Sequence, residues 1–312
     1  MYTMANSPPV KSGNLPHLLL YGPPGTGKTT CALAMCHQMW PDRLFKNRVL
    51  ELNASDERGL SIVRNKIKGF ANLSVSTPTP EELQTHPCPP FKIILLDESD
   101  TMTTDAQAAL RRIIEAYSKI TRFVLICNYV TRIITPLASR CAKFRFKALE
   151  TTSMKARLQE ISKGENVSVQ DSVLDTIITT SGGDMRRAVT TLQSTCAFSK
   201  NPTSDDVYEM SGIVPASVVV PLITECETGQ FKKMQDCVSD LMCRGYPAAE
   251  LLKTLGKLVM DGDLADIHKA EVSISIANAA KSLIDGADEE LQILNVSAGV
   301  VRAYVATKAM AN

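Results

Sequence analysis

The chain has 312 residues, of which 44% are hydrophobic, and this length and composition predict two or three folded domains. The formal net charge is +1, but residues 1–147 carry 19 Lys and Arg against 11 Asp and Glu, so the remaining half is acidic. This asymmetry predicts that the first half faces a polyanion, while a basic tail that would bind nucleic acid by itself is absent from the sequence.

The apolar runs are all shorter than about 18 residues, and the first sixteen residues lack the apolar centre of a signal peptide. We therefore expect no transmembrane helix and no secretory leader. The nine cysteines form no C-x-x-C pair, which disfavours a zinc ribbon and favours reduced, buried thiols in an intracellular compartment.

A glycine-rich loop follows the first apolar stretch of strand length. It reads Gly22-Pro23-Pro24-Gly25-Thr26-Gly27-Lys28-Thr29 and opens at Thr30 into a helical pattern. Strand, glycine loop and helix together predict a phosphate-binding loop, in which backbone N–H groups and the helix dipole face the phosphates. Lys28 would reach the β- and γ-phosphates, and the Thr29 hydroxyl would bind Mg²⁺. A glycine turn that ends in Lys-Thr by chance is the alternative, which the flanking strand and helix disfavour.

Apolar segments of strand length alternate with helical patterns through the first half of the chain. We predict strands at 17–21, 49–52, 91–96, 122–127 and 142–146, with helices at about 28–40, 59–71 and 104–118. The alternation predicts an α/β fold, with a parallel five-stranded sheet covered by helices on both faces. Ligands would bind beyond the carboxyl ends of the strands.

The second predicted helix places Ser61, Arg64 and Lys68 on one exposed face. From spacing alone, a solvated helix face is the preferred interpretation. Residues 72–90 contain five prolines and predict a long loop, for which a partner surface is plausible.

The apolar strand that begins at Lys92 ends in Asp97 and Glu98. In a phosphate-loop site, Asp97 would hold Mg²⁺ through its water shell, and Glu98 would orient and activate the attacking water. An acidic turn after a strand is the alternative. The Asn-Lys-x-Asp guanine reader of GTPases is missing, so the site is predicted to take ATP.

Thr104-Asp105-Ala106-Gln107 predicts a capping box at the start of a helix, on which Gln107 and Arg111 share an edge. Residues 111–147 carry nine basic residues and a single acid, Glu115. The next strand ends in Asn128, which could cap a turn or hydrogen-bond the γ-phosphate or the attacking water.

Together these motifs resemble the AAA+ clamp loaders, and closely the small subunits of replication factor C. The resemblance rests on the loop 22–29, on Asp97-Glu98 and Asn128, on the run Leu52–Gly59, on Ala109-Leu110-Arg111-Arg112 and on Ser139-Arg140-Cys141. It covers residues 14–215 strongly and the helical remainder weakly.

The resemblance implies a role for several residues. Asn128 corresponds to the sensor of the γ-phosphate, and Arg140 to the finger that each subunit inserts into its neighbour's ATP site. Arg186, in Gly183-Asp184-Met185-Arg186-Arg187, corresponds to a second sensor in the lid. The face formed by Ser61, Arg64 and Lys68 would touch the DNA backbone without reading sequence, and Gln107 and Arg111 would couple that face to the ATP site.

The resemblance also implies an arrangement of domains. We expect a disordered tail at 1–13, a nucleotide-binding domain at 14–149, a three-helix lid at 150–212 and a helical collar for oligomerisation at 213–312. Family members carry a Trp-Val-Glu-Lys-Tyr-Arg-Pro-like segment over the adenine, and Met1–Ser12 contains nothing comparable. Ser99 stands where the family usually has alanine.

The function implied is that of a nuclear, ATP-hydrolysing subunit of a hetero-oligomeric pentamer, which opens a sliding clamp and places it on primer–template DNA in replication and repair. A scaffold subunit that binds nucleotide without hydrolysing it is the main alternative, against which Lys28, Asp97 and Glu98 argue. A P-loop kinase for a small molecule is disfavoured by the Asp97-Glu98 pair, by Arg140 and by the extra helical domains.

Overall fold

The structure of the chain, a computed structural model, describes residues 15–311 apart from 56–62, 76 and 200. The predicted tail at 1–13 therefore lies outside the described residues. The chain forms two compact units: the first runs to Glu165 and takes in Ser181–Thr190, and the second comprises Asn166–Thr180 and the chain from Thr191 onward.

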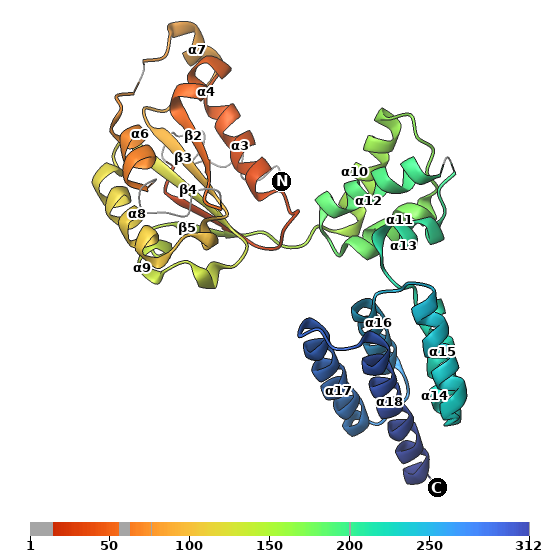
Figure 1. Cartoon of the computed structure of the whole chain (residues 1–312). Coiled ribbons are helices and arrows are strands. Elements are labelled where there is room, and N and C mark those ends of the chain that lie inside the picture. Colours follow the sequence, from red (N-terminus) through yellow and green to blue (C-terminus); the bar gives the residue numbers. More distant parts are fainter. Residues whose placement is uncertain (1–14, 56–62, 76, 200, 312) are drawn as a thin grey trace. The chain divides into compact units, whose positions relative to one another are not determined.

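The first unit is built on the predicted parallel sheet of five strands. These are β1 (Leu18–Tyr21), β2 (Val49–Asn53), β3 (Lys92–Asp97), β4 (Thr121–Cys127) and β5 (Ala142–Arg145), in the spatial order β2-β3-β4-β1-β5 (Figure 1). Every neighbouring pair is parallel, so the carboxyl ends of β1, β3 and β4 meet at one edge of the sheet.

Successive side chains of the central strands enter two different cores, as the period of two in a strand requires. Leu18 and Leu20 pack on the face covered by α3 (Lys28–Met39) and α4 (Asp42–Arg48), together with buried Trp40. Leu19 packs on the other face, under α6 (Lys68–Asn72), α8 (Thr104–Tyr117) and α9 (Thr135–Ala138) (Figure 1). Both faces of the sheet are therefore covered at its centre, which explains why β1, β3 and β4 are mostly buried apolar runs.

The predicted helix at 59–71 takes a different form in its described part. A π-helical turn at Val63–Ile67 precedes α6, so the spacing of an α-helix does not hold through this segment. Ile67 is buried, and Lys68 is exposed. Ser61 lies outside the described residues, as does the side chain of Arg64.

The region between α6 and β3 is not a simple loop. It contains a short helix, α7 (Pro80–Thr85), whose capping box is formed by Thr79 and Glu82. The buried ammonium of Lys92 donates to the carbonyls of Phe70, Ala71 and Leu73 and so ties the end of α6 to the start of β3.

The predicted capping box of Thr104 and Gln107 is wrong. Thr103 is the N-cap of α8, and its hydroxyl accepts from the N–H of Ala106. Gln107 is instead buried, where its amide donates to the carbonyls of Met102 and Arg132. Gln107 is used in the interior rather than in the local cap because buried polar groups need hydrogen-bond partners.

The rest of the chain is helical. Residues 150–212 hold α10 (Thr151–Gly164), α11 (Asp171–Ser181), α12 (Met185–Phe198) and α13 (Ser204–Ser211), which is one described helix more than the predicted three. Residues from 213 onward form α14 (Ala216–Thr228), α15 (Phe231–Cys243), α16 (Ala248–Asp261), α17 (Asp266–Ile284) and α18 (Glu289–Ala311), with one shared apolar core.

Within the described ranges, no single helix is long and apolar enough to cross a membrane. The pair formed by α13 and α14, which is bent by 82°, meets the criterion jointly by length and composition.

Candidate active site

The glycine loop between β1 and α3 has the backbone that the sequence predicts for a phosphate cradle. Gly22 has φ 147° and Gly25 has φ 66°, conformations that side chains rarely adopt. A Cβ on Gly22 would lie 2.1 Å from the carbonyl oxygen of Phe146, so the loop packs too closely there for any other residue. Helix α3 then begins at Lys28, with its N-terminus at the end of the loop.

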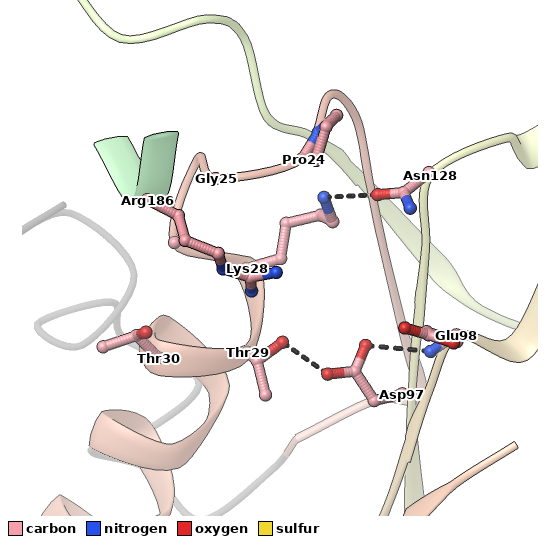
Figure 2. A pocket seen from close by; sticks show the side chains of 10 residues that line it. Pro24, Gly25, Lys28, Thr29, Thr30, Asp97, Glu98, Asn128 and Arg186 are labelled. Atoms are coloured by element: carbon pink, nitrogen blue, oxygen red, sulfur yellow. Dashed lines mark hydrogen bonds between the residues drawn. The ribbon is translucent and has the colours of Figure 1, made fainter. Parts of the chain in front are cut away.

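Lys28 is buried beneath this loop and all of its ammonium hydrogens have acceptors. Its Nζ donates to the carbonyls of Gly22 (2.9 Å) and Pro23 (2.8 Å). It also donates to Oδ1 of Asn128 (2.9 Å) (Figure 2). Burial lowers the pKa of Lys28 from its ordinary value, and the negative charge of Asp97 opposes that shift. The lysine therefore joins the loop after β1 to the residue after β4.

Two acids lie at the carboxyl end of β3, at the same edge. The Thr29 hydroxyl donates to Oδ2 of Asp97 (2.6 Å), and Oδ1 of Asp97 accepts from the N–H of Glu98 (2.8 Å) (Figure 2). Glu98 has φ 51°, which is the left-handed region. Such a conformation costs about 1–3 kcal/mol for a residue other than glycine and is concentrated at functional sites.

The residues after β4 are held by a buried carboxylate. Oδ2 of Asp100 accepts from the N–H of Asn128 (3.2 Å) and from the N–H of Tyr129 (3.0 Å). The buried Ser99 hydroxyl donates to the carbonyl of Ile126 (2.8 Å), so serine at this position adds a bond between the end of β3 and β4. The two residues thus fix the backbone that presents Asn128.

Arg186 reaches the site from the start of α12. Oδ1 of Asp184 caps this helix by accepting from the N–H groups of Arg186 (2.9 Å) and Arg187 (3.1 Å). The N–H of Met185 donates to the carbonyl of Gly25 (3.2 Å), so the helix start and the phosphate loop are hydrogen-bonded directly.

These side chains surround one polar cavity of about 110 Å³. Its walls are formed by the predicted residues Pro24, Gly25, Gly27, Lys28, Thr29, Thr30, Asp97, Glu98, Asn128 and Arg186 (Figure 2). The cavity is the size of a small anionic group and combines two cations with two carboxylates, which suits a phosphate with a divalent cation.

A larger cavity of about 720 Å³ adjoins it, since both are lined by Gly25, Gly27, Thr30 and Arg186. Its other walls are mainly apolar and come from Leu149, Met154, Met185 and Val189. An apolar cavity of this size beside a phosphate cradle is suited to a nucleoside.

The oxygens of Thr29 and Asp97 fit a magnesium ion. They lie 2.6 Å apart at the polar cavity, and a hydroxyl and a carboxylate are oxygen ligands that Mg²⁺ accepts while it keeps bound water. Among the residues the structure describes, no group of three or more acidic, His or Cys side chains forms a metal cage. The donor set therefore matches an ion shared with phosphate oxygens.

Several predicted residues do not line this site. Arg140 follows α9 and borders a separate cavity with His17 and Arg122. Lys68 lies at the start of α6, and Gln107 and Arg111 lie on α8, outside the lining of both nucleotide cavities.

Asp100 and the apolar wall of the larger cavity are not among the residues predicted from the sequence. Asp100 stands three residues after Asp97, the last residue of β3. This position is a sequence signal for a residue near the site. The wall residues Met154, Met185 and Val189 are spaced as ordinary helix core and give no such signal.

Sequence comparison divides the chain between three family profiles. The profile described as ATPase family associated with various cellular activities (AAA) matches residues 18–149, and that of the RCF1/5-like AAA+ ATPase lid domain matches 156–197. The profile of the replication factor C C-terminal domain matches 214–299.

Full-length relatives give the same result. Replication factor C subunit 4 of Arabidopsis thaliana is 48% identical over 295 residues, which are 94% of this chain and 86% of that protein. Replication factor C subunit 2 of Saccharomyces cerevisiae is 48% identical, covering 92% and 83% of the two chains. The chain belongs to the replication factor C subunit family. Subunit 4 of Homo sapiens is 45% identical, covering 94% and 80%.

Membership confirms the family predicted from the motifs. The chain is thus a nucleotide-binding AAA+ ATPase and a clamp-loader subunit of DNA replication, which belongs to a hetero-oligomeric complex. Its phosphate loop and acidic pair agree with hydrolysis, and nothing favours the scaffold alternative.

Proposed function

We propose that this subunit uses ATP and Mg²⁺ to help open a sliding clamp and place it on primer–template DNA in the nucleus. The observation that carries the proposal is the polar cavity, in which Lys28, Glu98, Asn128 and Arg186 converge beside the Thr29–Asp97 pair. These groups can bind phosphates and activate a water molecule.

Each group has a separate task. The backbone N–H groups of Gly25–Thr30 and the ammonium of Lys28 hold the phosphates, and Mg²⁺ on Thr29 and Asp97 supplies positive charge to the phosphate oxygens when bound. The carboxylate of Glu98 accepts a hydrogen bond from the attacking water and orients it. Asn128 hydrogen-bonds the γ-phosphate or that water, and Arg186 closes from α12.

The base is proposed to lie in the larger cavity. Its apolar walls can contact an adenine ring, and they come from within residues 15–190. Met154 and Met185 are therefore candidates for adenine binding, in addition to any family segment that contacts the base.

We assign the in-trans finger to Arg140. Its place outside both nucleotide cavities supports a role at a neighbouring subunit's site, where an arginine can raise the rate about 10³–10⁵-fold. We propose residues 14–149 as the nucleotide-binding domain, 150–212 as the lid and 213–312 as the collar that holds the homologous subunits in a pentamer.

Contact with DNA is assigned to Ser61, Arg64 and Lys68, of which Lys68 is exposed. These groups would bind backbone phosphates without sequence preference. Gln107 and Arg111 on α8 would couple that contact to the ATP site, because Gln107 hydrogen-bonds the segment that leads from Asn128 to α9.

The test is ATP hydrolysis by the assembled complex, with clamp and primed DNA, for the wild type, Glu98→Gln and the matched control Glu165→Gln, whose side chain is exposed after α10. We expect Glu98→Gln to abolish turnover at this subunit's site while ATP still binds, and Glu165→Gln to behave as wild type. A hydrolysis rate that does not depend on clamp and DNA, or that is unchanged at this site by Glu98→Gln, would refute the proposal.

A second experiment addresses Arg140. The Arg140→Ala chain should bind ATP normally, while hydrolysis at the adjacent site falls. Loss of nucleotide binding by the mutated subunit itself would contradict the assignment in trans.

A further inference from the structure

Both terminal nitrogens of the Arg140 guanidinium contact groups of the same chain. Its Nη1 donates to the carbonyl of Pro136 (2.6 Å), and its Nη2 lies 2.5 Å from Oε1 of Glu115 on α8. A guanidinium has five N–H donors, so three remain for other acceptors. The side chain of Arg140 keeps 34% of its surface exposed, which leaves those donors accessible.

Glu115 is the one acid in residues 111–147, among nine basic residues. The same oxygen that pairs with Arg140 also accepts from Nε of Arg111 (3.1 Å), and the cavity beside Arg140 is lined by a further cation, Arg122. The hydrogen bond from Arg111, together with the charge of Arg140, holds the pKa of Glu115 below its ordinary value. Glu115 therefore stays anionic among several cations.

The ion pair of Glu115 with Arg140 is poorly suited to stabilising the fold. Glu115 keeps 44% of its side-chain surface exposed, and an exposed ion pair contributes little to stability because water screens it. The pair instead restricts a long side chain that has many rotamers, at a residue whose proposed task is to reach a phosphate. Cavity space of about 290 Å³ beside Arg140 would otherwise permit other rotamers.

We propose that Glu115 is the positioning residue of Arg140: it holds the guanidinium in the orientation that the neighbouring ATP site requires. The inference rests on the proposed in-trans role of Arg140. Glu115 touches neither nucleotide nor reacting atoms; besides its contact with Arg111 it binds the guanidinium of Arg140, and through this second contact it acts on the neighbouring site.

The experiment uses the assembled complex in which the catalytic carboxylate is intact only at the site that receives Arg140. We expect Glu115→Ala to lower kcat at that site by about fivefold, since Pro136 still holds one edge and the full rotamer freedom is not restored. Glu115→Gln, which keeps length without charge, should lie between alanine and wild type. The KM for ATP should not change, because the ground-state contacts of ATP do not involve Glu115.

A double-mutant cycle with Arg140→Ala tests whether Glu115 acts through Arg140, separately from whether Arg140 acts at the neighbouring site. If Glu115 acts only through Arg140, Glu115→Ala has no further effect on kcat in the Arg140→Ala background. The matched control is Glu165→Gln, which changes an exposed glutamate after α10 and should leave kcat unchanged.

The possible results are distinct. Wild-type kcat for Glu115→Ala, a raised kcat, or an additive loss in the double variant would each overturn the positioning role while Arg140→Ala still lowers kcat. If Arg140→Ala itself has no effect, the in-trans assignment fails first.

Discussion

Replacing Asp100 by alanine removes the acceptor that fixes the backbone of Asn128. Two N–H groups, of Asn128 and Tyr129, converge on one carboxylate oxygen of Asp100, whose residue is 8% exposed. A hydrogen bond to a charged group contributes about 1.5–3 kcal/mol, and part of this is returned because the carboxylate no longer needs to be buried. We expect Asp100→Ala to lower the free energy of unfolding by about 2–4 kcal/mol.

Asp100→Asn is the matched variant. Because both bonds reach the same oxygen, a single amide oxygen can accept both, and neutral hydrogen bonds are about half as strong as charge-assisted ones. The loss for asparagine should therefore be about 1 kcal/mol. Turnover by the complex should follow the same order, with alanine most impaired because Asn128 is no longer held.

The assay is urea unfolding followed by the fluorescence of Trp40, the single tryptophan, which is completely buried in the first unit. This probe avoids treating the chain, with its two compact units, as one two-state system. Equal unfolding midpoints for Asp100→Ala and Asp100→Asn would refute the reasoning, because they would mean that the two N–H groups do not depend on this oxygen.

Burial lowers the pKa of His17 to about 4 from 6.5, and its Nδ1 accepts from the N–H of Phe123. As the pH falls, the unfolded chain therefore binds the proton before the folded chain does. The free energy of unfolding is highest above about pH 6.5 and falls by about 1–2 kcal/mol toward pH 4. His17→Gln should flatten that part of the pH profile, and an unchanged profile would contradict this. Lys92→Met leaves three carbonyls at the end of α6 without their buried donor and should cost about 2 kcal/mol in urea unfolding, whereas a stability equal to wild type would show that water replaces the ammonium. Gly25→Ala puts a Cβ 1.6 Å from Oδ1 of Asp184 at φ 66°, and should weaken nucleotide binding about tenfold in a fluorescent-nucleotide titration. Adding Asp184→Ala should restore part of that affinity; no restoration would assign the loss to backbone strain alone.

The strands and most of the site could be predicted from the sequence because both follow from short-range patterns. Continuous apolar runs separated by helical spacing predict a parallel sheet, and its topology brings the residues after β1, β3 and β4 to one edge. Lys28, Asp97 and Asn128 therefore meet although 100 residues separate the first from the last.

What could not be predicted depends on partners distant in sequence. Gln107 fits a capping box in its local sequence, yet in the structure it is buried and donates to the carbonyl of Arg132. The charge of Glu115 was evident from the sequence, but its pairing with Arg140 requires α8 and the turn after α9 to lie together. A π-helical turn before α6 likewise breaks the regular spacing on which the face of Ser61, Arg64 and Lys68 was predicted.

The three acceptors of Lys28 have a consequence for how nucleotide affinity is interpreted. Its ammonium is already coordinated by two loop carbonyls and by Asn128, so a phosphate oxygen must displace at least one of them to be bound by Lys28. Binding at this lysine is an exchange reaction, and the observed affinity reports only the difference between the old and new partners. If the amide of Asn128 is the partner displaced, the arrival of the phosphate frees that side chain at the same moment. Phosphate binding at the loop after β1 would then change the hydrogen bonding of Asn128 at the end of β4 through the ammonium of Lys28 alone.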